Sequence, residues 1–248
     1  LSSEGRSTST TILSLSALRT LRRDETLRQT ARKLLSFTDN RQDASLQAGH
    51  FNDFVEVGLI RAALYRAVAD GGESGLQHDQ LALRVFQALN LPFDLYAIDP
   101  QGVSNRSKRR LAEQAFRDVL GYRVYQDLRR GWRITAPNLE QCGLLQIDYL
   151  DLQEICADNE VWAGCHATLT TATATQRYHV CKVLLDILRR GLAIRVDYLD
   201  SVYQEGMKQR SSQHLAIPWA IDESERLTHD FIAVPGSVRY RSNREYLF

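Results

Sequence analysis

The feature that most constrains the fold is a short apolar run, residues 34–37, that passes directly into polar turn formers and then into a long helical pattern. This order is typical of a buried parallel strand that leads into a helix. Asp39 and Asn40 suit the start of that helix, because their side-chain oxygens can accept hydrogen bonds from its unpaired backbone N–H groups. Arg41 and Gln42 would then stand at the carboxyl end of the strand, where open α/β sheets bind their ligands.

The continuous stretch from Leu35 to Phe51, which reads LSFTDNRQDASLQAGHF, resembles a known family. It is similar to the opening strand and helix of the second RecA-like lobe in large bacterial superfamily 2 DEAD/DEAH-box helicases, where the segment FTDNRQD corresponds to the motif usually numbered four. The resemblance covers roughly residues 5–70, and residues 122–149 resemble the same proteins less sharply. It implies that Asn40, Arg41 and Gln42 contribute to strand binding in the intact lobe. The residues alone equally fit a strand–helix unit of another α/β protein.

Three helicase motifs are missing from the sequence. There is no Gly-x-x-x-x-Gly-Lys-Ser/Thr phosphate loop, no Asp-Glu-x-Asp/His magnesium motif and no late Gln-x-x-Gly-Arg-x-Gly-Arg motif that supplies arginine fingers. The resemblance therefore implies that ATP and Mg²⁺ belong to the parent protein, with no catalytic or cofactor site in this region. We expect the isolated chain not to hydrolyse ATP. The first residue, Leu1, and a single methionine, Met207, suggest a piece of a longer protein.

The overall charge of the chain does not predict a ligand. Thirty-one basic residues are offset by thirty acidic ones, which leaves a formal charge of +1. Only local clustering could therefore indicate nucleic-acid binding. No apolar run approaches the ~20 residues needed to cross a bilayer, and no signal-peptide pattern is present. We expect a cytoplasmic protein with no membrane partner.

The apolar periodicity predicts a mainly α fold with small β elements, an α/β arrangement. Helices are expected at residues 10–21, 41–70, 81–89, 111–120, 122–130, 152–162, 175–190 and from 200 to 207, and strands at 34–37, 132–136 and 144–149. Three helices followed by a hairpin are the order of a winged-helix module, with residues 122–130 as the third helix and 137–143 as the wing. We therefore predict a partial RecA-like segment over residues 1–74, a winged-helix-like unit over 75–163, and a second helical and strand unit with a tail over 164–248.

Two arginine pairs are the leading candidates for phosphate contact: Arg129 with Arg130, and Arg189 with Arg190. Each pair precedes a glycine and a predicted strand, so residues 128–134 and 188–194 are either a repeat or a common helix-to-strand joint. Trp132 could stack on a base of a single strand. The alternatives are that the arginines favour the helix dipole or a solvated face, as do Arg19, Arg22, Arg23 and Arg28 at an earlier helix end, and that Trp132 packs in the core.

The four cysteines, Cys142, Cys156, Cys165 and Cys181, form no Cys-x-x-Cys pair. With His166 and His179 nearby, a zinc site is conceivable, but the spacings match no common ligand pattern. Small buried thiols are the favoured interpretation, and no metal site is predicted.

These observations predict an accessory region of an ATP-dependent helicase that binds or positions nucleic acid for the motor, with DNA favoured over RNA. Its expected partners are nucleic acid and the remainder of the helicase chain. The alternative is a protein-interaction or regulatory insertion that does not contact nucleic acid. Near-neutral charge and the acidic stretch 148–160 favour this alternative.

Overall fold

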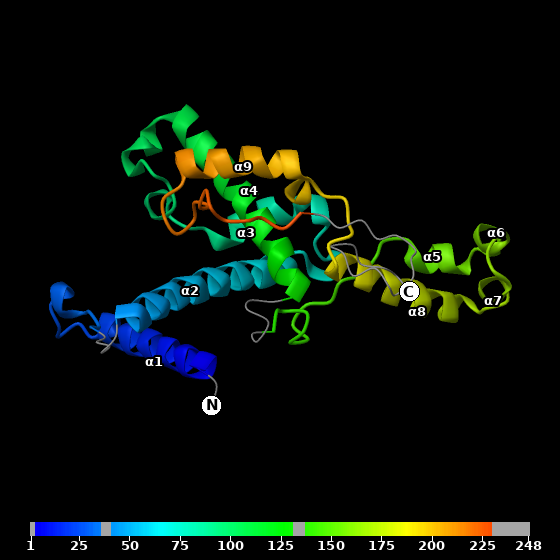
Figure 1. Cartoon of the computed structure of the whole chain (residues 1–248), viewed down its shortest axis with the longest axis horizontal. Coiled ribbons are helices and arrows are strands. Elements are labelled where there is room, and N and C mark those ends of the chain that lie inside the picture. The colour runs from blue at the N-terminus through cyan, green and yellow to red at the C-terminus, as the bar shows by residue number, and fades with distance from the viewer. Residues whose placement is uncertain (1–2, 36–40, 131–136, 230–248) are drawn as a thin grey trace. The chain divides into compact units, whose positions relative to one another are not determined.

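The computed structural model describes residues 3–35, 41–130 and 137–229, and over these residues the chain is mainly helical. No strand forms within them; the nearest feature is an isolated bridge between Ala97 and Leu215. The mainly α expectation is confirmed. The residue contacts divide the chain into unit 1, residues 1–59, and unit 2, residues 60–248 (Figure 1).

Unit 1 is built from α1, Ser3–Arg23, and the first part of α2, Arg41–Asp70. A short 3₁₀ helix, η1 (Gln29–Ala31), lies between them. His50 on α2 is buried, and its ring nitrogens lie 3.2 Å from Thr11 Oγ1 and 3.4 Å from Thr8 Oγ1 on α1. The two helices are therefore joined by a polar contact in their interface.

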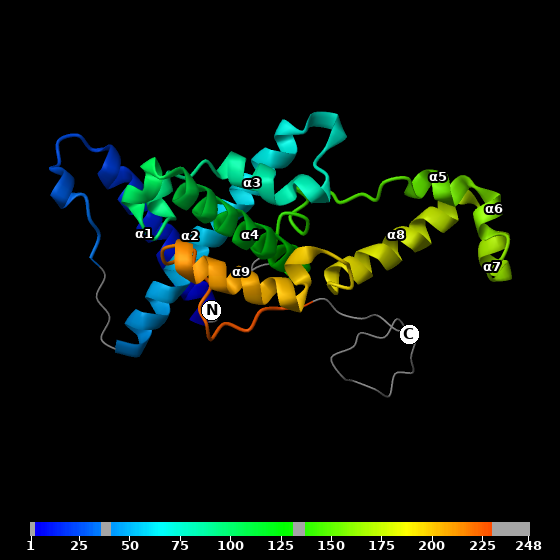
Figure 2. The ribbon, with the colours of Figure 1, turned by 90° about the horizontal axis from the view of Figure 1, so that it is seen from above.

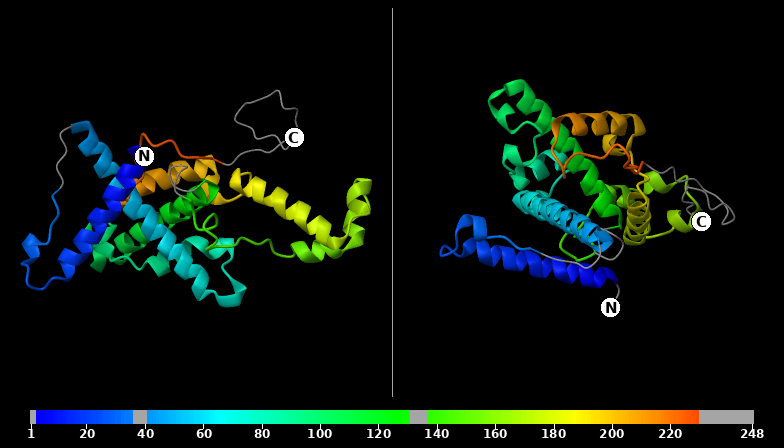
Figure 3. Two further views of the ribbon diagram at one scale, coloured as in Figure 1. Left: turned by 90° about the horizontal axis from the view of Figure 1, so that it is seen from below. Right: turned by 60° about the vertical axis from the view of Figure 1, so that its left-hand side comes forward.

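The larger core of unit 2 lies between α3, Leu81–Leu89, α4, Arg106–Arg130, and α9, Ser201–His214. Phe116 on α4 is fully buried, with its ring centroid 4.5 Å from that of Tyr96 and 4.9 Å from that of Trp219. Figure 3 shows α4 and α9 side by side. They are also joined by Asp118, which accepts hydrogen bonds from Tyr203 and Arg210 of α9.

A second, smaller core joins four other helices of unit 2, which we call the small lobe: α5 (Leu152–Ala157), α6 (Asn159–Trp162), α7 (Ala167–Thr170) and α8 (Ala174–Arg190). Figure 2 shows α5, α6 and α7 together beside the N-terminal part of α8, away from α3 and α9, while α8 also contacts α4. Buried Arg177 on α8 donates hydrogen bonds to the backbone oxygens of Cys156, Leu169 and Thr170. The lobe therefore depends on one charged side chain as well as on its apolar contacts.

The predicted break at Gly121 is wrong, because α4 continues through this position as one helix. Gly121 serves a different purpose there: a Cβ atom would lie 2.7 Å from Cζ of Tyr198. The glycine thus allows the Tyr198 ring to approach the helix backbone. Residues 111–120 and 122–130 are not separate helices, so the three-helix order expected of a winged helix is absent from the described residues.

The predicted strands are not found where the structure describes them. Residues 144–149 alternate between exposed and half-buried side chains as a strand would, but they pair with no other strand. Leu34 and Leu35 are not in a strand, and residues 36–40 and 131–136 lie outside the described residues. The wing expected at 137–143 is a compact turn over residues 139–143.

Other expected elements are confirmed or extended. The helices at residues 41–70, 81–89 and 175–190 correspond to α2, α3 and α8, and α1 and α9 are longer than expected. The helix expected at 152–162 is divided at Asp158, whose Oδ1 accepts a hydrogen bond from the Glu160 N–H. Connections of unit 2 contain the 3₁₀ helices η2 (Gly72–Ser74), η3 (His78–Gln80), η4 (Phe93–Leu95), η5 (Pro100–Ser104) and η6 (Asp197–Leu199). The three predicted domains stay a prediction.

Candidate nucleic-acid interface

Arg189 and Arg190, one of the predicted pairs, meet a carboxylate at the end of α8. Nη2 of Arg189 donates to Oε1 of Glu140 at 2.6 Å, and Nη2 of Arg190 donates to the same oxygen at 3.0 Å. Glu140 lies in the turn after α4, fifty residues earlier in the sequence. No local pattern in the sequence predicts this contact, because neither the turn nor its position next to α8 follows from the residues around it.

The turn that carries Glu140 is held by its own hydrogen bonds. The Asn138 N–H donates to Oε1 of Gln141, and the Gln141 N–H donates back to Oδ1 of Asn138, both at 2.9 Å. Nδ2 of Asn138 donates to the backbone oxygen of Asp127 on α4 at 3.0 Å. The side chain of Glu140 takes no part in these bonds, so the turn and the ion pair are built separately.

Three further side chains complete the group around Arg189. The Tyr149 hydroxyl donates to Oδ1 of Asp186 at 2.8 Å, Arg189 Nη2 lies 3.3 Å from the same oxygen, and Lys182 Nζ lies 3.6 Å from Oδ2. Burial would raise the pKa of Asp186, but the Tyr149 hydrogen bond and the charges of Lys182 and Arg189 more than offset it and lower that pKa. We call Glu140, Tyr149, Lys182, Asp186, Arg189 and Arg190 the Arg189 cluster.

Hydrogen bonding within the Arg189 cluster is incomplete. Oε2 of Glu140 and both Nε and Nη1 of Arg189 are buried without a hydrogen-bond partner. The Arg189 and Glu140 side chains are 11% and 12% exposed, whereas Arg190 is 52% exposed. Burial tends to lower the pKa of Arg189, but the Tyr149 and Glu140 contacts raise it overall, so the guanidinium stays charged. The cluster therefore contains a buried guanidinium with unused donors, that of Arg189, next to the exposed guanidinium of Arg190.

Of the other predicted site residues, the structure describes the side chain of one, Arg129. Arg129 is half-buried on α4. Asn40 and Trp132 lie outside the described residues, and so do the side chains of Arg41, Gln42 and Arg130, although their backbones belong to α2 and α4. Nothing in the described residues tests whether the two arginine pairs are a repeat, but residues 192–196 form no strand.

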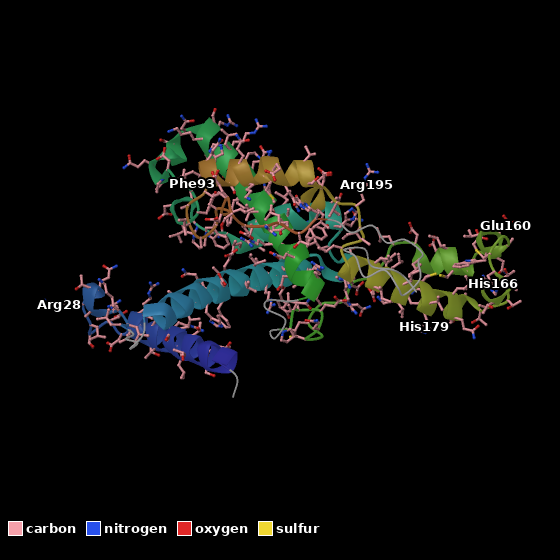
Figure 4. The ribbon with its side chains drawn as sticks, viewed as in Figure 1. Arg28, Phe93, Glu160, His166, His179 and Arg195 are labelled. Carbon is pink, nitrogen blue, oxygen red and sulfur yellow. The ribbon has the colours of Figure 1, made fainter. Side chains whose placement is uncertain are left out.

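Unit 1 contains more basic residues close together than the Arg189 cluster does. From the sequence, these residues were expected to interact with the dipole of the preceding helix. Residues 19–33, which we call the basic turn, contain six basic residues against Asp24 and Glu25. The exposed ones are Arg19, Arg22, Arg23, Arg28 and Lys33. Figure 4 shows Arg28 on this segment.

The shape of the basic turn is fixed by two of its own side chains. Nε and Nη1 of Arg32 donate to the backbone oxygens of Leu27 and Arg22, each at 3.1 Å. Oδ1 of Asp24 accepts hydrogen bonds from both the hydroxyl and the N–H of Thr26, and these bonds lower the pKa of Asp24. The closely spaced arginines are visible in the sequence. The hydrogen bonds that fold the loop around them are not.

The cysteines belong mainly to the small lobe. Cys156 is fully buried, Cys181 packs against the same core, and burial raises the pKa of the Cys181 thiol. Cys142 and Cys165 are exposed, and His166 and His179 are labelled on the lobe in Figure 4. Among the described residues, no three His, Cys, Asp or Glu side chains are grouped so that they could hold a metal ion.

No family model, curated protein or solved structure matches this chain. Within the part of the chain that the structure describes, every helix is too short or too polar to cross a membrane.

Proposed function

We propose that this chain is an accessory region of an ATP-dependent helicase and that it binds or positions DNA for the motor. ATP and Mg²⁺ act elsewhere in the parent protein. Two features support this proposal, and both lie in unit 1: the helicase-like residues 35–51 and the basic turn. The region itself carries no catalytic step, so its contribution is contact with the phosphate backbone.

The observation that carries the proposal is the exposed charge of the basic turn. Guanidinium groups bind phosphate through several N–H donors, and each phosphate that they neutralise releases condensed counterions. Arg22, Arg23 and Arg28 are exposed within seven positions. Since Arg32 and Asp24 already hold the loop, little backbone entropy remains to be lost when these arginines meet a strand, and the remaining entropic cost is that of ordering their side chains.

Salt-dependent binding of a fluorescein-labelled oligonucleotide tests the proposal. We expect the logarithm of the association constant to fall linearly with the logarithm of the salt concentration. The variant R22Q/R23Q/R28Q should bind more weakly at low salt, with a slope smaller by about 2–3. Single-stranded and duplex DNA and an RNA of the same sequence, compared in parallel, identify the preferred substrate.

The matched control is R66Q/R84Q/R110Q, which removes the same charge from three exposed positions of unit 2. We expect its salt dependence to stay close to that of the wild type. Equal effects of the two variants would mean that net charge alone matters, and absence of wild-type binding at low salt would overturn the proposal.

A second candidate function is contact with the remainder of the helicase chain. On α8, four apolar side chains at helical spacing are exposed: Val180, Val183, Leu184 and Ile187. An apolar row of this kind is typical of a surface that meets another protein. In the parent chain, V183D/I187D would then lower ATPase activity, whereas the oligonucleotide affinity of this region would not change.

A further inference from the structure

We propose that Arg189 and Arg190 form a phosphate-binding site that Glu140 occupies in the free protein. The ligand chemistry is a phosphate group, either of a nucleic-acid backbone or of a free polyphosphate. Binding of a nucleic-acid backbone at this site rests on the proposed function, whereas binding of a free polyphosphate does not.

The first step is the geometry of the ion pair. One carboxylate oxygen of Glu140 accepts hydrogen bonds from both arginines, at 2.6 Å and 3.0 Å. Guanidinium groups bind carboxylate and phosphate oxygens with the same donors and at the same distances. Glu140 therefore stands where an oxygen of a phosphate group would stand.

The second step is that Glu140 satisfies these donors only in part. Its Oε2 and the Nε and Nη1 of Arg189 are buried without a hydrogen-bond partner. Buried donors that lack an acceptor are costly. A phosphate group offers more oxygen atoms than the single one that Glu140 supplies, so it can accept hydrogen bonds that the free protein leaves unmade.

The third step is that the arginines stay supported when Glu140 leaves. Arg189 keeps its contact with Asp186, which in turn accepts from Tyr149 and lies near Lys182. The turn is held without Glu140, by the two hydrogen bonds between Asn138 and Gln141 and by the bond from Asn138 Nδ2 to the Asp127 backbone oxygen. Arg190 is half-exposed and provides the approach from solvent. Displacement thus requires a side-chain movement and not unfolding of the turn.

The experiment compares E140Q with the wild type, using calorimetric titration with inorganic pyrophosphate and, separately, anisotropy with the labelled oligonucleotide. E140Q should bind pyrophosphate about fivefold more tightly, because the competing charge is gone. The gain should be lost in E140Q/R189Q/R190Q. E205Q, which removes one exposed carboxylate from α9, is the control for net charge.

The outcomes separate the two sources and the two proposals. A gain for both probes supports the site and assigns it to nucleic acid, whereas a gain for pyrophosphate alone supports the site and assigns it to free polyphosphates. No gain for either probe, or an equal gain in E205Q, overturns the inference. The pyrophosphate titration involves no nucleic acid, so its failure is separate from failure of the basic turn to bind DNA. Should E140Q not fold, as judged by circular dichroism, E140D, whose shorter side chain withdraws the carboxylate, replaces it with a smaller expected gain.

Discussion

The Tyr122 hydroxyl accepts a hydrogen bond from the backbone N–H of Thr228 at 2.9 Å, although 106 positions separate the two residues. Nε2 of Gln204 donates to the backbone oxygen of the same threonine at 2.7 Å. Tyr122 lies on α4 and Gln204 on α9, and both are buried. Thr228 therefore bonds to both helices, in addition to the contacts of Glu225 with Arg123 of α4 and Lys208 of α9.

We expect Y122F to lower the free energy of unfolding by about 1–2 kcal/mol, because it leaves the Thr228 N–H without its acceptor. Urea unfolding followed by circular dichroism measures this change. Y65F removes the hydroxyl of a half-exposed tyrosine on α2 and should change stability little. Equal stability of Y122F and the wild type would show that water replaces the phenol.

The glycine at position 121 predicts an unusual substitution result. Alanine in a helix interior is ordinarily more stable than glycine by about 1 kcal/mol. At Gly121 the added methyl would lie within 3.0 Å of the Tyr198 ring, which packs between Tyr125 and Tyr203 and has little room to move. G121A should therefore destabilise the protein by about 1–3 kcal/mol.

The control for G121A is G58A on α2, where the added methyl would meet no atom within 4 Å. Thermal unfolding should show a small stabilisation for G58A and a loss for G121A. The double variant G121A/Y198L should recover part of that loss, and failure to recover any would contradict the packing explanation.

The helices were predictable where their signals are local. The apolar spacing of residues 81–89, the Gly71–Gly75 stop after α2 and the start of α8 all lie within a few residues of the element that they define. At the start of α8, Thr173 and Gln176 form a capping box. Gly121 was misjudged because Tyr198, seventy-seven positions later, determines its role, and no local pattern shows that approach.

Longer-range relationships explain the remaining errors. Leu145 packs against the larger core and Tyr149 against the smaller one, so residues 144–149 alternate in burial while they connect two cores. The strand predicted at these residues is wrong, because a strand also needs a neighbour to pair with. The charge of Arg189 and Arg190 is equally visible in the sequence, whereas their contact with Glu140 joins residues about fifty positions apart and has no local signal.

Arg177 is expected to be essential for the small lobe. R177M would remove the Arg177 donors to the backbone oxygens of Cys156 and Thr170 and one of the two donors to that of Leu169, which keeps the Ala172 N–H. It would also remove the guanidinium that lies 5.4 Å from the Trp162 ring centroid. We expect a loss of about 3 kcal/mol in lobe stability. Hydrogen exchange should accelerate over residues 152–190 but not over 112–125, and R84Q should change neither.

Alkaline pH should destabilise the protein through its buried tyrosines. Burial raises the pKa of Tyr125 to about 12, compared with about 10 for an unfolded chain. The folded state binds the phenol proton more tightly, so this contribution to stability is complete below pH ~10 and is lost as pH rises to ~12. The slope is up to about 1.4 kcal/mol per pH unit for one group.

Urea unfolding at several pH values between about 9 and 12 measures that slope. Y125F should reduce it, whereas Y65F should leave it unchanged. An identical slope for Y125F and the wild type would place the alkaline sensitivity at other groups.

The continuity of α4 has a mechanical consequence for unit 2. Its 25 residues make a rod about 37 Å long. Asn138 attaches the Glu140 turn to Asp127, which lies near the C-terminal end of α4. Both carboxylate oxygens of Asp127 accept hydrogen bonds from Arg61 of α2. At the middle of the helix, Asp118 accepts hydrogen bonds from Tyr203 and Arg210 of α9. A pull applied at Arg189 would thus travel along a stiff lever to α2 and α9 without having to cross a flexible joint at Gly121.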